Sequence, residues 1–196
     1  MTDFLVIGLG NPGGEYAATR HNLGFQVLNR LAQELSVSFR YSPSLEAEYC
    51  RGLLGKQQVA LAKPQTYMNL SGRSVVSLVT FFEIADPARV IVVHDDLDIP
   101  LGQVKIKKKG GGGGHNGVAS VMEFLQTADF LRLRLGIGLS IRPPDVVDYV
   151  LSPFTVQEAE VVEEMVGKAV EALGVLVNQG ASKAMNLFHR RSNEVD

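Results

Sequence analysis

Four polar segments of this 196-residue sequence carry the side chains that proton-transfer chemistry needs: Asn11 and His21 in the first, then Asn69, Asp95 and Asn116. An imidazole titrates near neutral pH and can take a proton from water. A carboxylate that accepts the other ring N–H fixes the tautomer, and Asp95 is the best candidate for that partner of His21. Amides can donate to a polarised ester carbonyl without titrating. The set therefore predicts hydrolysis by a water that His21 activates.

Each of these residues also has a purely structural explanation. Asn69 and Asn116 could cap helices, and a single histidine such as His21 is more often a cap or a surface residue. Their position after predicted strands or at helix starts favours one shared cleft, because ligands bind at the carboxyl ends of strands in α/β sheets. The sequence has no G-x-S-x-G elbow, and Cys50 lies away from these loops. Direct attack by water is therefore favoured over a covalent intermediate.

Two other classes of site are weaker interpretations. Gly8-Leu9-Gly10-Asn11-Pro12-Gly13 matches the dinucleotide-binding fingerprint, but the helical pattern begins only near Asn22, so no helix opens on the glycines. The ribose-binding acid is also missing from 39–43. A metal-dependent hydrolase would use Asp95, Asp96, Asp98 and His115, yet these acids lack the glycine-punctuated spacing of a calcium loop. We expect no cofactor and no metal.

Alternating strand and helix patterns must position these residues. Periodicity predicts strands over 4–8, 46–54, 58–63, 90–93, 104–108 and 131–137, and helices over 22–35, from 71, 117–126, from 155 to 180 and over 182–189. Thr155 and Glu158 form a capping box before the long helix. The alternation predicts an α/β fold, a single three-layer domain over 1–196 around a twisted mixed sheet, with a frayed tail at about 190–196.

Composition limits the partners. The net charge is −2, so no general affinity for nucleic acid is indicated, but Lys105 and the run Lys107–Lys109 lie beside five glycines and can bind phosphate locally. The single cysteine excludes an internal disulfide and a cysteine zinc site. No apolar stretch is long enough to cross a bilayer, and no signal peptide is indicated. We expect a cytoplasmic protein without membrane contact.

Five stretches of the sequence resemble bacterial peptidyl-tRNA hydrolase. They are G-L-G-N-P-G-x-x-Y-x-x-T-R-H-N-x-G, K-P-x-T-Y-M-N-x-S-G, H-D-D-L-D-x-P-x-G, G-G-H-N-G and R-L-R-x-G-I-G, in the order of that family and covering residues 4 to about 138. Ala184-Met185-Asn186 also resembles the C-terminal helix of the family. The resemblance implies a monomeric cytosolic enzyme that cleaves the ester between a peptide and the 3′ end of tRNA, recycling tRNA from stalled translation.

The resemblance also implies a role for each matching position. His21 is the base that activates water, Asp95 keeps it basic, and Asn11 distinguishes N-blocked from free aminoacyl-tRNA. The remaining implied contacts hold the substrate: Asn69 and Asn116 bind its backbone and the water, Tyr16 and Tyr67 line the site of the tRNA end, Met68 packs against His21, and Lys107 and Arg134 grip the 5′ phosphate.

The sequence departs from the family pattern at one place that bears on contacts with the tRNA body. The family often continues Leu-Lys-Ser after the glycine of G-G-H-N-G, whereas this chain has Val118-Ala119-Ser120, and Lys108 and Lys109 extend the basic run instead. A non-catalytic RNA-binding relative is the alternative function. The joint presence of His21, Asp95 and the three asparagines argues against it, since a binding-only descendant would be expected to lose at least one.

Overall fold

A seven-stranded mixed sheet forms the centre of the computed structural model, which describes residues 2–141 and 143–189. The strand order is β2-β3-β4-β1-β5-β7-β6. Strands β4, β1, β5 and β7 run parallel, while β2, β3 and β6 pair antiparallel with their neighbours. The bounds are β1 Phe4–Gly8, β2 Arg40–Ser42, β3 Ala47–Leu54, β4 Gln57–Pro64, β5 Val90–Pro100, β6 Val104–Lys107 and β7 Leu131–Gly138.

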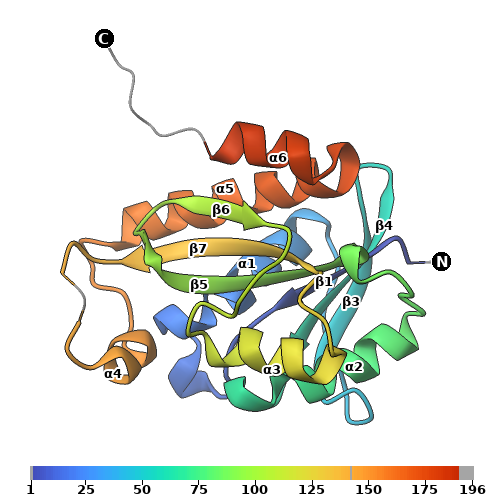
Figure 1. Cartoon of the computed structure of the whole chain (residues 1–196), viewed down its shortest axis with the longest axis horizontal. Coiled ribbons are helices and arrows are strands. Elements are labelled where there is room, and N and C mark those ends of the chain that lie inside the picture. Colours follow the sequence, from blue (N-terminus) through green and yellow to red (C-terminus); the bar gives the residue numbers. More distant parts are fainter. Residues whose placement is uncertain (1, 142, 190–196) are drawn as a thin grey trace.

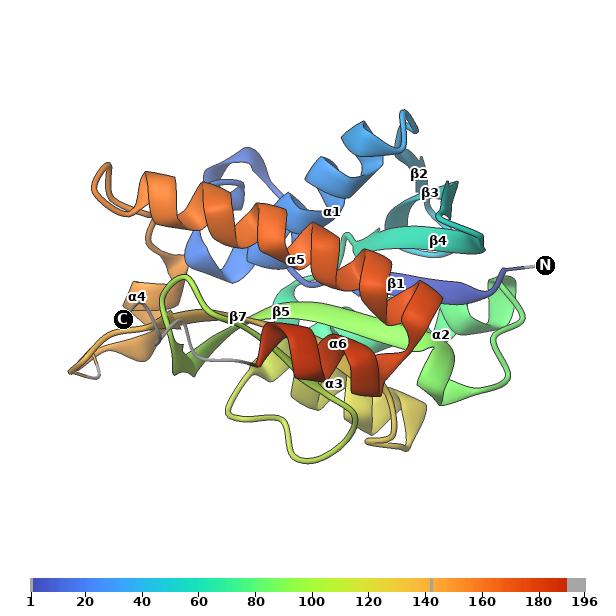
Figure 2. The same ribbon diagram turned by 90° about the horizontal axis from the view of Figure 1, so that it is seen from above.

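Helices cover both faces of this sheet (Figures 1 and 2). One face carries α1 (Leu23–Glu34), α5 (Ala159–Gln179) and α6 (Ala181–Phe188), and the other carries α2 (Ser71–Phe81) and α3 (Asn116–Leu125). The short helix α4 (Val146–Leu151) follows β7 and stands at the end of the sheet (Figure 1). The described residues also contain the 3-10 turns η1 Gly14–Tyr16, η2 Arg20–Asn22, η3 Met68–Leu70 and η4 Pro87–Arg89.

The apolar side chains of the central strands alternate between two cores. In β1, Val6 packs with α1 and α5, whereas Leu5 and Ile7 pack with α2 and α3. This division follows from the period of two in a strand, and it confirms the predicted three-layer α/β fold. No helix within residues 2–141 and 143–189 is long and apolar enough to cross a membrane.

Strand β5 is longer than its sequence predicts. The apolar pattern stops at Val93, but β5 continues to Pro100 because residues as far as Asp96 pair in register with β7. Acidic residues are depleted in strands, so local preference gives no sign of this extension. His94 and Asp95 are therefore held in a sheet, and the prediction that they occupy a loop is wrong. The sequence also gave no prediction of β2 or α4, and the predicted tail at 190–196 lies outside the described residues.

Two glycines allow α1 to cross β1 at close range. A Cβ on Gly8 would lie 2.4 Å from the carbonyl oxygen of Gly24, and a Cβ on Gly24 would lie 2.4 Å from the Leu9 nitrogen. Gly13 adopts a φ of 115°, which other residues rarely reach. The glycines of the fingerprint therefore serve packing and a turn, and α1 begins at Leu23, after the loop that carries His21.

Candidate active site

A cleft of about 240 Å³ lies beyond the carboxyl ends of the parallel strands. Its polar wall includes His21, Asp95, His115 and Asn116, and the opposite wall is formed by valines of α4. The structure thus brings three of the predicted site residues together. It also places them at the edge of the sheet where α/β proteins bind ligands.

His21 is hydrogen-bonded to Asp95 within this cleft. The Nδ1 of His21 lies 3.0 Å from both carboxylate oxygens of Asp95. A carboxylate only accepts, so Nδ1 carries the proton and donates it. This tautomer leaves Nε2 as the basic nitrogen, without a hydrogen-bond partner among the described residues. The pair can therefore take a proton from a water molecule.

A second histidine binds the same carboxylate. The Nε2 of His115 lies 3.0 Å from Oδ1 of Asp95, and its Nδ1 accepts from the backbone N–H groups of Gly117 and Val118 at the start of α3. The rings of His21 and His115 are 4.7 Å apart. The sequence singled out His115 only as a metal candidate, although its place just before a helix was a signal for an N-cap.

Electrostatics keep Asp95 ionised. Burial alone would raise the pKa of Asp95, but attraction and hydrogen bonding from His115 and His21 outweigh it and hold the pKa well below its ordinary value. The neighbouring His94 is fully buried, and burial followed by repulsion from His115 lowers its pKa well below the ordinary value. His94 donates its Nδ1 proton to the Asp95 carbonyl oxygen at 2.6 Å. The centre is therefore one ionised, buried carboxylate that accepts from His21 and His115, with His94 held neutral beside it.

The acids of the rival metal-dependent interpretation do not gather into a ligand group among the described residues. Asp96 accepts from Arg134 at 2.7 Å with Oδ2 and from the Asp98 backbone N–H with Oδ1. Among the described residues, the metal-ligand types that gather in a group of three are His21, Asp95 and His115, whose ligand atoms lie within 4.8 Å of one another. In this arrangement both histidines donate a proton to Asp95, which is the geometry of a hydrogen-bonded base.

Asn11 is buried outside the lining of the cleft and is fixed by contacts that the sequence did not reveal. Its backbone N–H donates to Oδ1 of Asn22, and its carbonyl oxygen accepts from Nδ2 of Asn22, each at 2.9 Å. Its own Oδ1 accepts from the Met68 backbone N–H at 2.8 Å. Asn22 is thus a positioning residue missed at the sequence level, and the signal was its place directly after His21. The sulfur of Met68 packs against Gly117 at the start of α3, where a Cβ on residue 117 would lie 2.4 Å from it.

Arg20 anchors the loop that presents His21. It is 4% exposed and donates to both carboxylate oxygens of Glu158, at 2.9 and 2.7 Å. Its guanidinium also lies over the rings of Tyr149 and Phe154. Glu158 accepts from the Thr155 backbone N–H as the predicted capping box requires, but α5 begins at Ala159, four residues after the predicted cap Thr155. The His21 loop is therefore fastened to the segment between α4 and α5.

Of the remaining predicted residues, Asn116 lines the cleft, whereas Asn69, Tyr67 and Tyr16 are not part of its lining. Asn116 is exposed at the first position of α3. Asn69 and Tyr67 are exposed at η3, and Tyr16 is half-buried in η1. Cys50 is buried in β3, and burial raises the pKa of its thiol to about 11, which excludes it as a nucleophile near neutral pH.

Lys107 and Arg134 lie on adjacent strands, diagonally across one face. Lys107 pairs with Arg132 and Lys105 pairs with Arg134 in the register of β6 and β7, so all four cations share that face. Arg132 is buried and holds the glycine-rich loop through the carbonyls of Gly110 and Gly111. These four cations form a positive strip along β6 and β7, which Arg134 connects to the cleft through its ion pair with Asp96.

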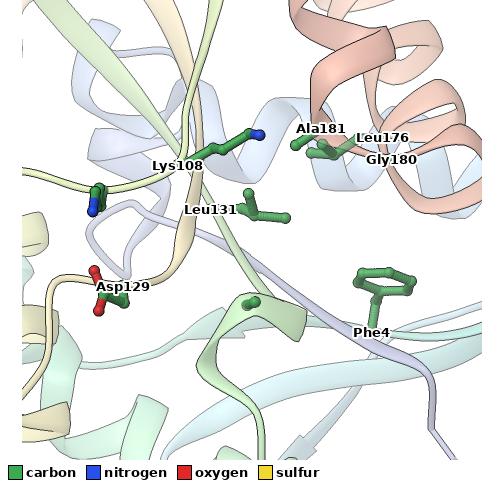
Figure 3. Close-up of a pocket in the computed structure, with 9 residues that line it drawn as sticks. Phe4, Lys108, Asp129, Leu131, Leu176, Gly180 and Ala181 are labelled. Carbon is green, nitrogen blue, oxygen red and sulfur yellow. The ribbon is translucent and has the colours of Figure 1, made fainter.

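A larger hollow of about 540 Å³ lies elsewhere, at the amino ends of β1 and β7 (Figure 3). Its walls are largely apolar, with Phe4, Leu131 and Leu176, and Lys108 reaches toward the start of α6. Lys108 is bonded there to the Ser182 hydroxyl at 3.0 Å. The described residues that line this hollow include no imidazole or side-chain amide, in contrast to the smaller cleft with His21, His115 and Asn116.

Comparison with known proteins decides the family. The family model described as peptidyl-tRNA hydrolase matches residues 5–195. The chain belongs to the peptidyl-tRNA hydrolase family. A family member from Desulfitobacterium hafniense (strain Y51) is 46% identical over 186 residues, which are 95% of this chain and 99% of that protein. The one from Aquifex aeolicus is 43% identical over 187 residues, 95% of this chain and 96% of that protein. The crystal structure of peptidyl-tRNA hydrolase from Acinetobacter baumannii superposes with a TM-score of 0.88 at 35% identity, covering 96% of each chain.

Proposed function

We propose that this member of the peptidyl-tRNA hydrolase family cleaves the ester between a peptide and the 3′ end of tRNA through a water activated by His21. The observation that carries the proposal is the hydrogen bond from Nδ1 of His21 to Asp95, which leaves Nε2 basic in a cleft. Family membership supports peptidyl-tRNA as the substrate.

The proton steps follow from this arrangement. Nε2 of His21 takes a proton from water while the water oxygen bonds to the ester carbonyl carbon. Asp95 remains ionised and stabilises the imidazolium that forms. When the ester bond breaks, the imidazolium returns its proton to the departing ribose oxygen. The products are a peptide carboxylic acid, which loses its remaining proton to solvent, and a tRNA with a free terminal hydroxyl.

The amides around the cleft are suited to the charge that develops on the carbonyl oxygen. Asn116 lines the cleft beside His21 and can donate its amide N–H to that oxygen. Asn69 lies on the neighbouring η3 turn, where it can hold the substrate backbone. Asn11 is locked by Asn22 and Met68, and a rigid amide is suited to distinguish an acylated nitrogen from a free ammonium. Tyr16 and Tyr67 are assigned to the tRNA end.

The positive strip accounts for the tRNA side of the substrate. Lys107 and Arg134 grip the 5′ phosphate in this proposal, with Arg134 sharing its guanidinium between the phosphate and Asp96. Lys107 is half-buried and forms no ion pair with another described residue, whereas Arg134 is paired with Asp96, so Lys107 is the more available of the two charges. Contacts with phosphate position the tRNA without reading its sequence.

One experiment tests the reaction and its selectivity together. Release of the amino acid is measured for N-acetyl-aminoacyl-tRNA and for the same tRNA with a free amino group, each with EDTA and without it. We expect cleavage of the acetylated substrate alone, unaffected by EDTA. Equal cleavage of both substrates would remove the role given to Asn11, and loss of turnover that a divalent ion restores would remove the metal-free mechanism.

A further inference from the structure

The carboxylate of Asp95 accepts from two imidazoles that donate through different ring nitrogens, Nδ1 of His21 and Nε2 of His115. Oδ1 of Asp95 lies 3.0 Å from both Nδ1 of His21 and Nε2 of His115, whereas Oδ2 contacts only His21. All three side chains are buried. In a buried site, a second donor to a carboxylate competes with the first for its negative charge, because little solvent is present to screen either one.

The protonation state of His115 is fixed from the opposite side. Its Nδ1 accepts from the backbone N–H groups of Gly117 at 3.1 Å and Val118 at 3.3 Å. A nitrogen that accepts carries no proton, so His115 must present its N–H from Nε2 to Asp95. The N-terminal end of α3 also disfavours a positive charge on this ring. His115 is therefore a neutral donor that cannot replace His21 as the base in this arrangement.

We propose that His115 is a positioning residue that sets the pH at which His21 loses its proton. The hydrogen bond that His115 donates to Asp95 weakens the interaction of that carboxylate with His21. This inference rests on the proposed role of His21 as the base. Without the hydrogen bond from His115, the Asp95 carboxylate would stabilise the imidazolium of His21 more strongly, so the ring would stay protonated to a higher pH. Sharing keeps a larger fraction of His21 unprotonated, and able to accept a proton, near neutrality.

The other groups around His21 leave Asp95 as its dominant charged partner. From β5, Asp96 also lines the cleft, but its carboxylate is paired with Arg134. From the His21 loop, Arg20 is turned to Glu158. The wall formed by α4 presents valines to the cleft, and His94 packs edge-on against His115, with ring centroids 4.8 Å apart.

The variant His115→Asn separates the two roles of His115. Asparagine is a good N-cap residue, so its side-chain oxygen can accept from the amides of α3 in place of Nδ1. Its side chain is too short to reach Asp95 as well. The matched control is Ser120→Ala, which removes a buried hydrogen bond of α3 to the Gly72 backbone N–H without touching Asp95. Thermal unfolding of both variants measures whether each is folded and how far each is destabilised.

The titration of the His21 ring is followed by NMR in the parent and both variants, with the signal assigned by its loss in His21→Asn. We expect the midpoint in His115→Asn to rise by roughly half to one pH unit, with no change in Ser120→Ala. An unchanged or lower midpoint in His115→Asn, or an equal rise in the control, would overturn the inference. In the parent at neutral pH, ring nitrogen shifts must also show His115 protonated at Nε2, and a proton at Nδ1 would contradict the sharing.

The pH dependence of kcat/KM separates this inference from the proposed mechanism. If His21 is the base, the acid limb moves with the NMR midpoint, and the rate well below it falls roughly three- to tenfold. If the midpoint moves while the acid limb stays, the sharing by His115 holds and the assignment of His21 as the base fails. The NMR measurement needs no turnover, so the two failures are distinguishable.

Discussion

Replacing Asp95 by asparagine would reverse the tautomer of His21. Oδ1 of Asp95 faces both histidines, and His115 can present only a donor to it because its Nδ1 is occupied by the amides of α3. The carbonyl oxygen of the new amide therefore stays at the Oδ1 position. Its NH₂ group then takes the place of Oδ2, which faces only Nδ1 of His21. This donor would face the N–H at Nδ1 of His21, which favours the tautomer in which His21 accepts at Nδ1 and carries its proton on Nε2, where it can no longer receive one from water.

The expected loss of kcat in Asp95→Asn is large because the variant changes the tautomer of His21 and also removes the charge that stabilises its imidazolium. In other enzymes, an asparagine that reverses the tautomer of a catalytic histidine lowers kcat by about 10⁴, or roughly 5 kcal/mol of barrier. We expect Asp95→Asn to lower kcat by about 10³ to 10⁴ with KM for N-acetyl-aminoacyl-tRNA within about threefold of the parent, since tRNA contacts lie elsewhere.

The assay is single-turnover release of the acetylated amino acid across pH 5 to 9, with tRNA affinity measured in parallel. Asp96→Asn is the control, because its carboxylate lies in the same cleft but bonds Arg134 instead of His21. A loss below about tenfold in Asp95→Asn, or an equal loss in Asp96→Asn, would refute the tautomer argument.

Three further outcomes are expected. Arg20→Ala leaves the carboxylate of Glu158 unpaired, so urea unfolding should show a loss of about 3 to 5 kcal/mol, and a loss under 1 kcal/mol would mean that the anchor is dispensable. Because burial raises the pKa of Cys50 to about 11, alkylation at pH 8 should be much slower in the folded protein than in urea, and stability should fall as pH rises from about 8.5 toward 11, where only the unfolded thiol ionises. Lys107→Ala should raise KM and reduce the slope of log KM against log salt by about 0.7 to 0.9 while kcat stays constant, and an unchanged slope would exclude a phosphate contact.

The sequence by itself determined the layers of the fold and the identity of the central pair. Period-two and period-3.6 patterns located β1, α1, β7 and α5, because each apolar face must be buried against another element. The rule that ligands bind beyond strand ends then brought His21 and Asp95 to one edge of the sheet, and the structure places them 3.0 Å apart.

Only the tertiary structure decided how these residues are held. The extension of β5 through Asp95 depends on pairing with β7, which is distant in sequence and overrides the low strand preference of acidic residues. The clamp of Asn22 on Asn11, the anchoring of Arg20 by Glu158 and the sharing of Asp95 by His115 are side-chain contacts between segments that have no periodic signal. Sequence patterns report which faces are buried, whereas the direction of each hydrogen bond is set by geometry that exists only after the segments have packed.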